Sequence, residues 1–234
     1  MIPENRIKEL DFARGFCVLA MIAIHFLYDL TELYFLFPVP PLYSAIKNHG
    51  GIVFFLISGI SATLGRRSFK RGCTVLLCAA LVSAVTSLTG SPVRFGVLSC
   101  LGFSMVLWTV FRTLPTSALL FFAGLSLLTG AIFQKTVVSF PFLYPLGLCR
   151  STFQSADYFP LFPYVGWFLL GAVAGRCLYP HRRSLFPRIA FSSPLSRFFR
   201  FCGVHALPLY LLHQPVLLAI LEAAFFLGEK FYES

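Results

Sequence analysis

Few of the 234 residues are charged, and this excludes an ordinary soluble domain. Hydrophobic residues make up 57% of the chain and Asp, Glu, Lys and Arg together only 12%, about half the charged share of a typical soluble protein. The formal net charge of +10 would suggest a nucleic-acid partner in a soluble protein, but the basic residues crowd between apolar runs, as they do beside membrane spans. The composition therefore predicts an integral membrane protein that contacts a lipid bilayer and no nucleic acid.

The 7 cysteines are odd in number and scattered along the chain. Most lie in or beside apolar runs, where a thiol packs as a small apolar group. Neither a CxxC pair nor a Cys/His spacing typical of zinc sites occurs, so the sequence predicts no disulfide framework and no metal site.

Apolar segments recur along the chain after an amphipathic lead-in at residues 3–14. They cover approximately residues 15–37, 52–65, 73–89, 95–112, 117–133, 161–178 and 204–227. Because a helical span needs about 20 apolar residues, we predict an all-α, polytopic membrane bundle of about seven transmembrane helices. Residues 1–234 are predicted to form a single domain. An additional re-entrant helix around residues 136–149 stays open as an alternative.

Lysine and arginine favour alternate connections, and this bias predicts the orientation in the membrane. Most of the 19 basic residues lie in the lead-in and in the connections after the second, fourth and sixth apolar segments. Because such residues concentrate on the cytoplasmic side, we predict a cytoplasmic N-terminus and an outer C-terminus. The basic, aromatic connection at residues 180–201 would then lie on the anionic inner leaflet, with a basic ligand site as the alternative.

One face of the helix that runs from the lead-in into the first apolar segment carries four ionisable residues, Asp11, Arg14, His25 and Asp29. On a helix, His25 lies about 16 Å beyond Arg14, roughly half of a ~30 Å hydrocarbon core. An ionisable group at that depth is costly unless it is used or partnered. We predict that His25 is a general base and that Asp29 holds its tautomer and stabilises its charged form. The alternative is a structural histidine bonded to a backbone carbonyl or a hydroxyl.

Arg14 marks the inner end of this face. An arginine at the mouth of a cavity suits the phosphates of a cytosolic cofactor, so Arg14 and Asp11 are predicted to form a cofactor-binding site. The alternative for Arg14 is a positively charged anchor at the lipid interface.

The last apolar segment carries a second polar cluster. His213 lies about 13 Å along a helix that starts near residue 204, again near mid-depth. Pro208 and Pro215 remove backbone donors, and kinks there would turn polar groups inward. We predict that Tyr210, His213 and Gln214 line a cavity, although Pro-kinked helices without such a role are common in membranes.

Five stretches of sequence, spread in order over nearly the whole chain, can be compared with a known family. They read RIKELDFARGFCVLAMIAIHFLYDL, FFLISGIS, FGVLSCLG, SADYFPLFPYVGWFLLGAVAG and ALPLYLLHQPVLL. Together they resemble the catalytic-domain family of heparan-alpha-glucosaminide N-acetyltransferase, particularly its small bacterial members. The spacing of Arg14 and His25 is also similar to the arginine–histidine motif of the broader transmembrane acyltransferase group, in which the histidine is regarded as catalytic. Two positions depart from the pattern: Ser99 stands where many relatives have histidine, and Val204 where they often have arginine.

The resemblance implies a membrane acyltransferase whose acyltransferase-like domain covers residues 1–234. It implies acetyl-CoA or another acyl-CoA as a donor substrate from the cytosol, with no permanently bound cofactor. A carbohydrate acceptor, such as an envelope sugar or glycan, would be reached from the outer side and held by Asp157 and Tyr158. The implied location is the bacterial inner or plasma membrane. The acceptor, the acyl chain, an acyl-histidine intermediate and a homo-oligomer are left open.

Two other functional classes are compatible with the same residues. A proton-coupled transporter would use His25, Asp29 and His213 near the midplane. A haem protein would use His25 and His213 as axial ligands.

Overall fold

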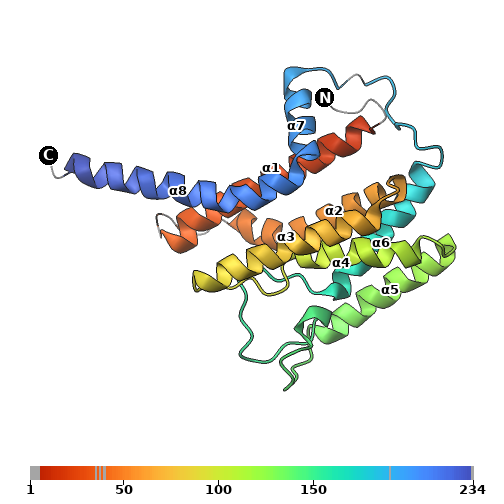
Figure 1. Cartoon of the computed structure of the whole chain (residues 1–234), viewed down its shortest axis with the longest axis horizontal. Coiled ribbons are helices and arrows are strands. Elements are labelled where there is room, and N and C mark those ends of the chain that lie inside the picture. The colour runs from red at the N-terminus through yellow and green to blue at the C-terminus, as the bar shows by residue number, and fades with distance from the viewer. Residues whose placement is uncertain (1–5, 35, 37, 39–40, 190, 233–234) are drawn as a thin grey trace. The chain divides into compact units, whose positions relative to one another are not determined.

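The computed structural model describes residues 6–34, 36, 38, 41–189 and 191–232, and the regular structure within them is helical (Figure 1). The elements in chain order are α1 (Lys8–Tyr28), the π-helical turn η1 (Asp29–Leu33), α2 (Pro41–Leu64), α3 (Ser68–Leu88), α4 (Val97–Phe111), α5 (Thr116–Phe133), the 3-10 turn η2 (Tyr144–Leu146), α6 (Leu161–Leu178), α7 (Pro194–Val204) and α8 (Ala206–Tyr232).

Each predicted apolar segment contains a helix over most of its described residues. Within the described residues, 5 helices are long and apolar enough to cross a membrane, and two shorter apolar helices, Gly50–Leu64 and Val97–Phe111, accompany them. The prediction of an all-helical, polytopic membrane protein is therefore confirmed. Residues 136–149, where the sequence left a re-entrant helix open, instead form a loop that contains η2 and is closed by a bridge between Val137 and Cys149.

The chain divides into two compact units. The first unit comprises residues 1–50 and 188–234, and the second comprises residues 51–187. A single domain over residues 1–234 stays a prediction.

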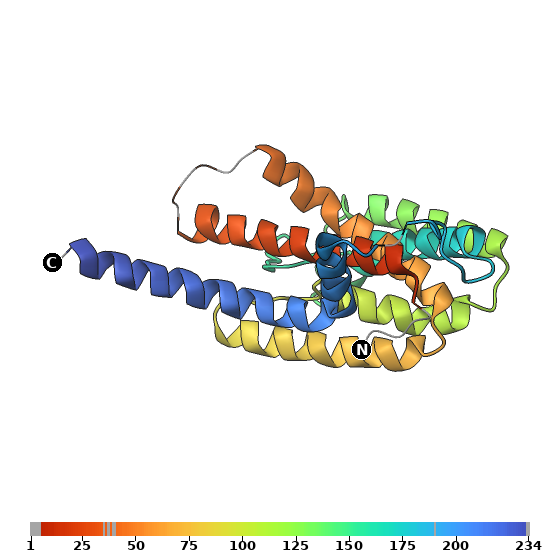
Figure 2. The same ribbon diagram turned by 90° about the horizontal axis from the view of Figure 1, so that it is seen from above.

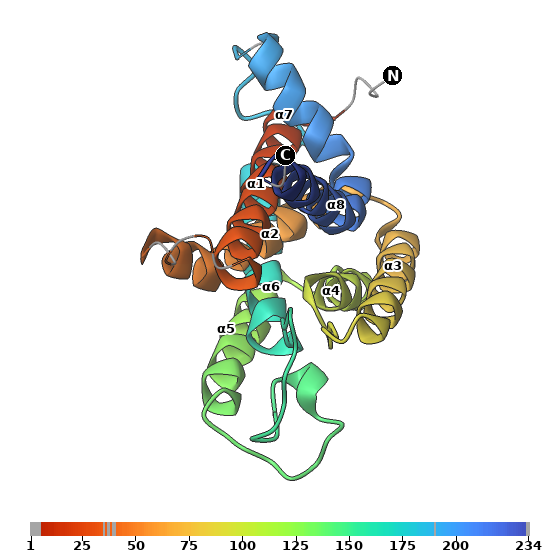
Figure 3. The same cartoon turned by 90° about the vertical axis from the view of Figure 1, so that its left-hand side faces the viewer.

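In the first unit, α1 and α8 run side by side in the same direction, and α7 crosses the start of α1 (Figures 2 and 3). Two glycines permit the crossing: a Cβ at Gly15 would overlap the carbonyl oxygen of Phe199, and a Cβ at Gly203 would overlap that of Asp11. Small residues let helix backbones approach this closely. The ring of Phe12 packs on Phe199 beside the crossing, with centroids 5.0 Å apart.

In the second unit, α5 packs on α6 and α3 packs on α4. The fully buried side chains of Phe55 and Phe168 form part of its core. The start of α4 is capped from a distant loop, because the Val97 amide donates to the Asp157 carboxylate at 3.0 Å. Helix N-termini leave amides unpaired unless an oxygen caps them in this way.

Candidate active site

The neighbouring helices α1 and α8 bring two histidines into contact. The ring centroids of His25 and His213 lie 4.8 Å apart, with their planes at 83°. Aromatic rings favour this edge-to-face arrangement. In this arrangement the two rings touch directly and leave no room for a porphyrin between them. The contact brings together the two histidines that the sequence places near mid-depth, and a shared cavity between them stays a prediction.

The tautomer of His25 is fixed by the backbone of its own helix. His25 Nδ1 lies 2.9 Å from the carbonyl oxygen of Met21, one turn back. Because a carbonyl oxygen can only accept, Nδ1 carries the proton and Nε2 keeps its lone pair. The structural alternative expected this same bond. A general base needs it too, since only a fixed tautomer presents the same nitrogen to every substrate.

His213 repeats the arrangement on α8. Its Nδ1 donates to the carbonyl oxygen of Tyr210 one turn back, and the rings of the two residues lie 5.4 Å apart. Within the described residues, His213 Nε2 is buried and has no hydrogen-bond partner. Leaving a buried acceptor unpaired costs about 1–3 kcal/mol. Buried polar atoms without a partner are therefore uncommon in side chains with a purely structural role.

Asp29 pairs with α8 instead of His25. Its side chain, in a residue only 1% exposed, accepts from Gln214 Nε2 at 2.9 Å on one oxygen and 3.0 Å on the other. The expectation that Asp29 holds the tautomer of His25 is therefore wrong, since the Met21 carbonyl does so. Stabilisation of the charged imidazole by Asp29 stays a prediction. Helical side chains lean toward the N-terminus, so the imidazole turns toward residue 21 and away from residue 29. The wide turn η1, which begins at Asp29, also changes the direction of its side chain relative to an α-helix.

A second charged cluster lies at the start of α1. Asp11 is 3% exposed and accepts from Arg6 at 2.9 and 2.7 Å and from Arg14 at 3.1 Å. Arg14 also reaches the carbonyl oxygen of Gly203 on α7 at 3.4 Å. Two guanidinium groups on one carboxylate leave a net positive charge. The buried Asp11 carboxylate is placed to orient the arginines and not to touch an anion itself. Sequence reasoning missed Arg6, which only its spacing to Asp11 could have suggested.

The connection between α5 and α6, in the second unit, holds the remaining predicted site residues, Asp157 and Tyr158. Asp157 caps α4, as described above. The Tyr158 hydroxyl donates to the carbonyl oxygen of Tyr144 at 2.6 Å and lies 3.1 Å from the sulfur of Cys149. Burial, followed by the contact with Cys149, raises the pKa of Tyr158 well above its usual range, so this hydroxyl stays protonated as a donor. These contacts shape the loop, and acceptor binding by Asp157 and Tyr158 stays a prediction.

The structure thus groups His25, Asp29, Tyr210, His213 and Gln214 along α1, η1 and α8, and Asp11 with Arg14 at the start of α1. Within the described residues, no group of three or more His, Cys, Asp and Glu side chains could hold a metal ion.

These features define a helical integral membrane protein with a histidine pair inside its apolar helices and an arginine cluster at the start of the first. Comparison with family models identifies it further. The model described as "Heparan-alpha-glucosaminide N-acetyltransferase, catalytic" matches residues 6–215, and the chain belongs to this family. The match begins at Arg6 and runs past Gln214, so it includes every residue of both clusters. Comparison with curated proteins and with solved structures gave no significant match. Family membership makes the protein a membrane acetyltransferase by class.

Proposed function

We propose that this protein transfers an acetyl or other acyl group from cytosolic acyl-CoA to an acceptor reached from the outer side. The observation that carries the proposal is the fixed tautomer of His25, whose Nδ1 is committed to the Met21 carbonyl. Nε2 is thereby presented as a base inside an apolar helix, beside the ring of His213. Family membership supplies the reaction class.

The chemistry follows from that nitrogen. As the acceptor hydroxyl or amine attacks the thioester carbonyl, His25 Nε2 takes its proton. The new bond to oxygen or nitrogen forms and the carbon–sulfur bond breaks. The CoA thiolate leaves and takes the proton back from His25 Nε2, which restores the base. General-base catalysis of this kind is worth roughly 10² to 10⁴-fold in rate.

The arginine cluster is the proposed donor site. Arg6 and Arg14, held by Asp11, would bind phosphate oxygens of CoA, for which guanidinium groups are well shaped. This places the donor at the start of α1, which the distribution of basic residues assigns to the cytoplasm.

The acceptor is proposed to be a sugar or glycan of the cell envelope. The distribution of basic residues assigns residues 134–160 to the outer side of the membrane. The acceptor is proposed to bind on that side. We keep Asp157 and Tyr158 there as proposed acceptor contacts, in addition to the bonds that they make within the loop.

Purified protein supplied with radiolabelled acetyl-CoA tests the proposal. We expect label to leave CoA and to appear in an added sugar or glycan acceptor. The proton-coupled transporter is the second candidate, favoured by the buried, unpaired Nε2 of His213, which suits proton relay. Substrate flux into proteoliposomes without acetyl-CoA consumption would favour the transporter and contradict the transferase.

A further inference from the structure

A single side-chain pair joins the end of α1 to α8 directly beside the two histidines. Gln214 donates to both oxygens of Asp29, at 2.9 and 3.0 Å. Gln214 follows His213 in the chain, and Asp29 lies one turn after His25 on the other helix. The pair therefore joins the two helices at the level of the ring contact.

The direction of this pair is set by its chemistry. The amide nitrogen points a proton between the two carboxylate oxygens, whereas a flipped amide would turn its oxygen toward the negative charge. The Gln214 oxygen is buried without a partner within the described residues. The side chain thus leaves its own oxygen unpaired, which costs free energy, while its nitrogen donates to the Asp29 carboxylate.

Two features make the orientation of His213 depend on an external contact. Neighbouring residues on a helix differ by about 100° in direction, so fixing the direction of Gln214 fixes that of His213. Pro215 follows within α8 and donates no hydrogen bond to the preceding turn, which weakens the helix there. The hydrogen bond from Gln214 to Asp29 holds this part of α8 in place where the backbone hydrogen bond is missing.

We infer that Gln214 is a positioning residue that, with Asp29 as its anchor, holds His213 against His25. The pair is called the amide–carboxylate clamp below. Its effect on turnover rests on the proposed function, in which His25 is the base. Asp29 then acts through α8 and His213, and no longer as the direct partner of the imidazole.

An exchange of the two groups tests the clamp. In Gln214→Glu two carboxylates face each other, and in Gln214→Ala the donor is lost. We expect kcat to fall about 10- to 100-fold in both, as for a buried hydrogen bond to a charged group, while the KM for acetyl-CoA changes less than about twofold. The double variant Asp29→Asn/Gln214→Glu keeps both side-chain lengths and reverses donor and acceptor. It should return kcat to within about threefold of wild type.

The chain offers a matched control between the same two helices. The Tyr34 hydroxyl donates to Glu222 on α8 at 3.0 Å, so Tyr34→Phe removes an interhelical hydrogen bond without touching either histidine. It should leave kcat within about twofold of wild type. Wild-type kcat in Gln214→Ala, or a double variant no better than Gln214→Glu, would overturn the inference.

A spectroscopic measurement tests the clamp without turnover. In protein labelled at histidine Cε1 with ¹³C, the resonances of His25 and His213 carry the ring-current effect of their mutual contact. We expect both to shift in Gln214→Ala, to return in the double variant, and to stay unchanged in Tyr34→Phe. Unmoved resonances in Gln214→Ala would overturn the clamp even in an active enzyme. Shifted resonances in a protein that consumes no acetyl-CoA would support the clamp and contradict only the proposed function.

Discussion

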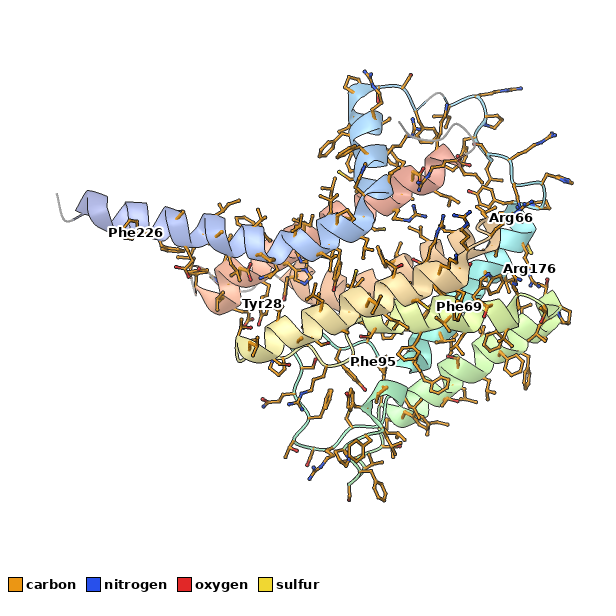
Figure 4. The ribbon with its side chains drawn as sticks, in the orientation of Figure 1. Tyr28, Arg66, Phe69, Phe95, Arg176 and Phe226 are labelled. Atoms are coloured by element: carbon orange, nitrogen blue, oxygen red, sulfur yellow. The ribbon has the colours of Figure 1, made fainter. Side chains whose placement is uncertain are left out.

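The two units satisfy their polar side chains in different ways, although both consist of apolar helices. In the second unit, several long polar side chains bind backbone carbonyls. Trp108 donates to the carbonyl oxygen of Ala62 at 3.1 Å. Arg176, labelled in Figure 4, donates to the carbonyl oxygen of Leu114 at 2.8 Å. Such bonds satisfy helix ends and loops that a membrane cannot hydrate, and their task is scaffolding.

In the first unit, charged side chains bind one another across turns and helices. Asp11 holds Arg6 and Arg14, and Asp29 holds Gln214. Charged and amide groups inside apolar helices are expensive, and they mark functional positions more often than structural ones. The comparison places the proposed chemistry of donor binding and proton transfer in the first unit.

The largest effect on stability is expected where α7 crosses α1. Gly15→Ala places a Cβ against the Phe199 carbonyl oxygen, whereas a Cβ at Gly124 of α5 meets no atom within 4 Å. Forcing atoms into a close-packed contact costs about 1–3 kcal/mol. Thermal unfolding in detergent should therefore show a clearly lower Tm for Gly15→Ala and little change for Gly124→Ala. Equal Tm values for the two variants would contradict the close crossing.

The arginine cluster should affect donor affinity more than chemistry. Arg6→Ala and Arg14→Ala should each raise the KM for acetyl-CoA about tenfold with little change in kcat, because each removes a charged hydrogen bond distant from the thioester. Lys8→Ala is the control, since it removes an exposed charge at the same end of α1. An equal effect of Lys8→Ala would show that general surface charge, and not the paired arginines, attracts the donor.

The smallest effect is expected for the scaffold in the second unit. Asp157→Ala removes the cap from the Val97 amide and should lower stability by about 1 kcal/mol. Asp157→Asn keeps an accepting oxygen and should cost less. Melting temperature and the KM for the acceptor, measured on both variants, separate the two roles of this side chain. A raised KM with an unchanged Tm would assign it to the acceptor alone and remove its scaffold role.

The sequence predicted the helices because apolar runs of span length have few other structures open to them in a membrane. It also placed His25 and His213 at a similar depth along their helices. The start of α2 at Pro41 lies earlier than predicted, because residues 41–51 are too polar to register as part of a span. Helical backbone continues there beyond the apolar run.

The hydrogen-bond partners in the site were not predictable from spacing alone. Asp29 stands one turn from His25, which suggested a pair, but the partner is Gln214, distant by 185 positions. The cap on Val97 similarly comes from Asp157, 60 positions away. Spacing along one helix indicates which side chains share a face. It does not indicate which side chain from another helix or loop forms a hydrogen bond with that face.

The central claim is that His25 is a base and not merely a core histidine. His205 supplies the matched control, because its Nδ1 makes the same kind of bond to a carbonyl oxygen one turn back, that of Phe201, at 2.9 Å. Acetyl transfer and Tm should be measured for His25→Ala and His205→Ala in detergent. The account predicts that His25→Ala folds and loses roughly 10² to 10⁴-fold in turnover, while His205→Ala keeps near wild-type turnover. A well-folded His25→Ala protein with wild-type turnover would contradict the account.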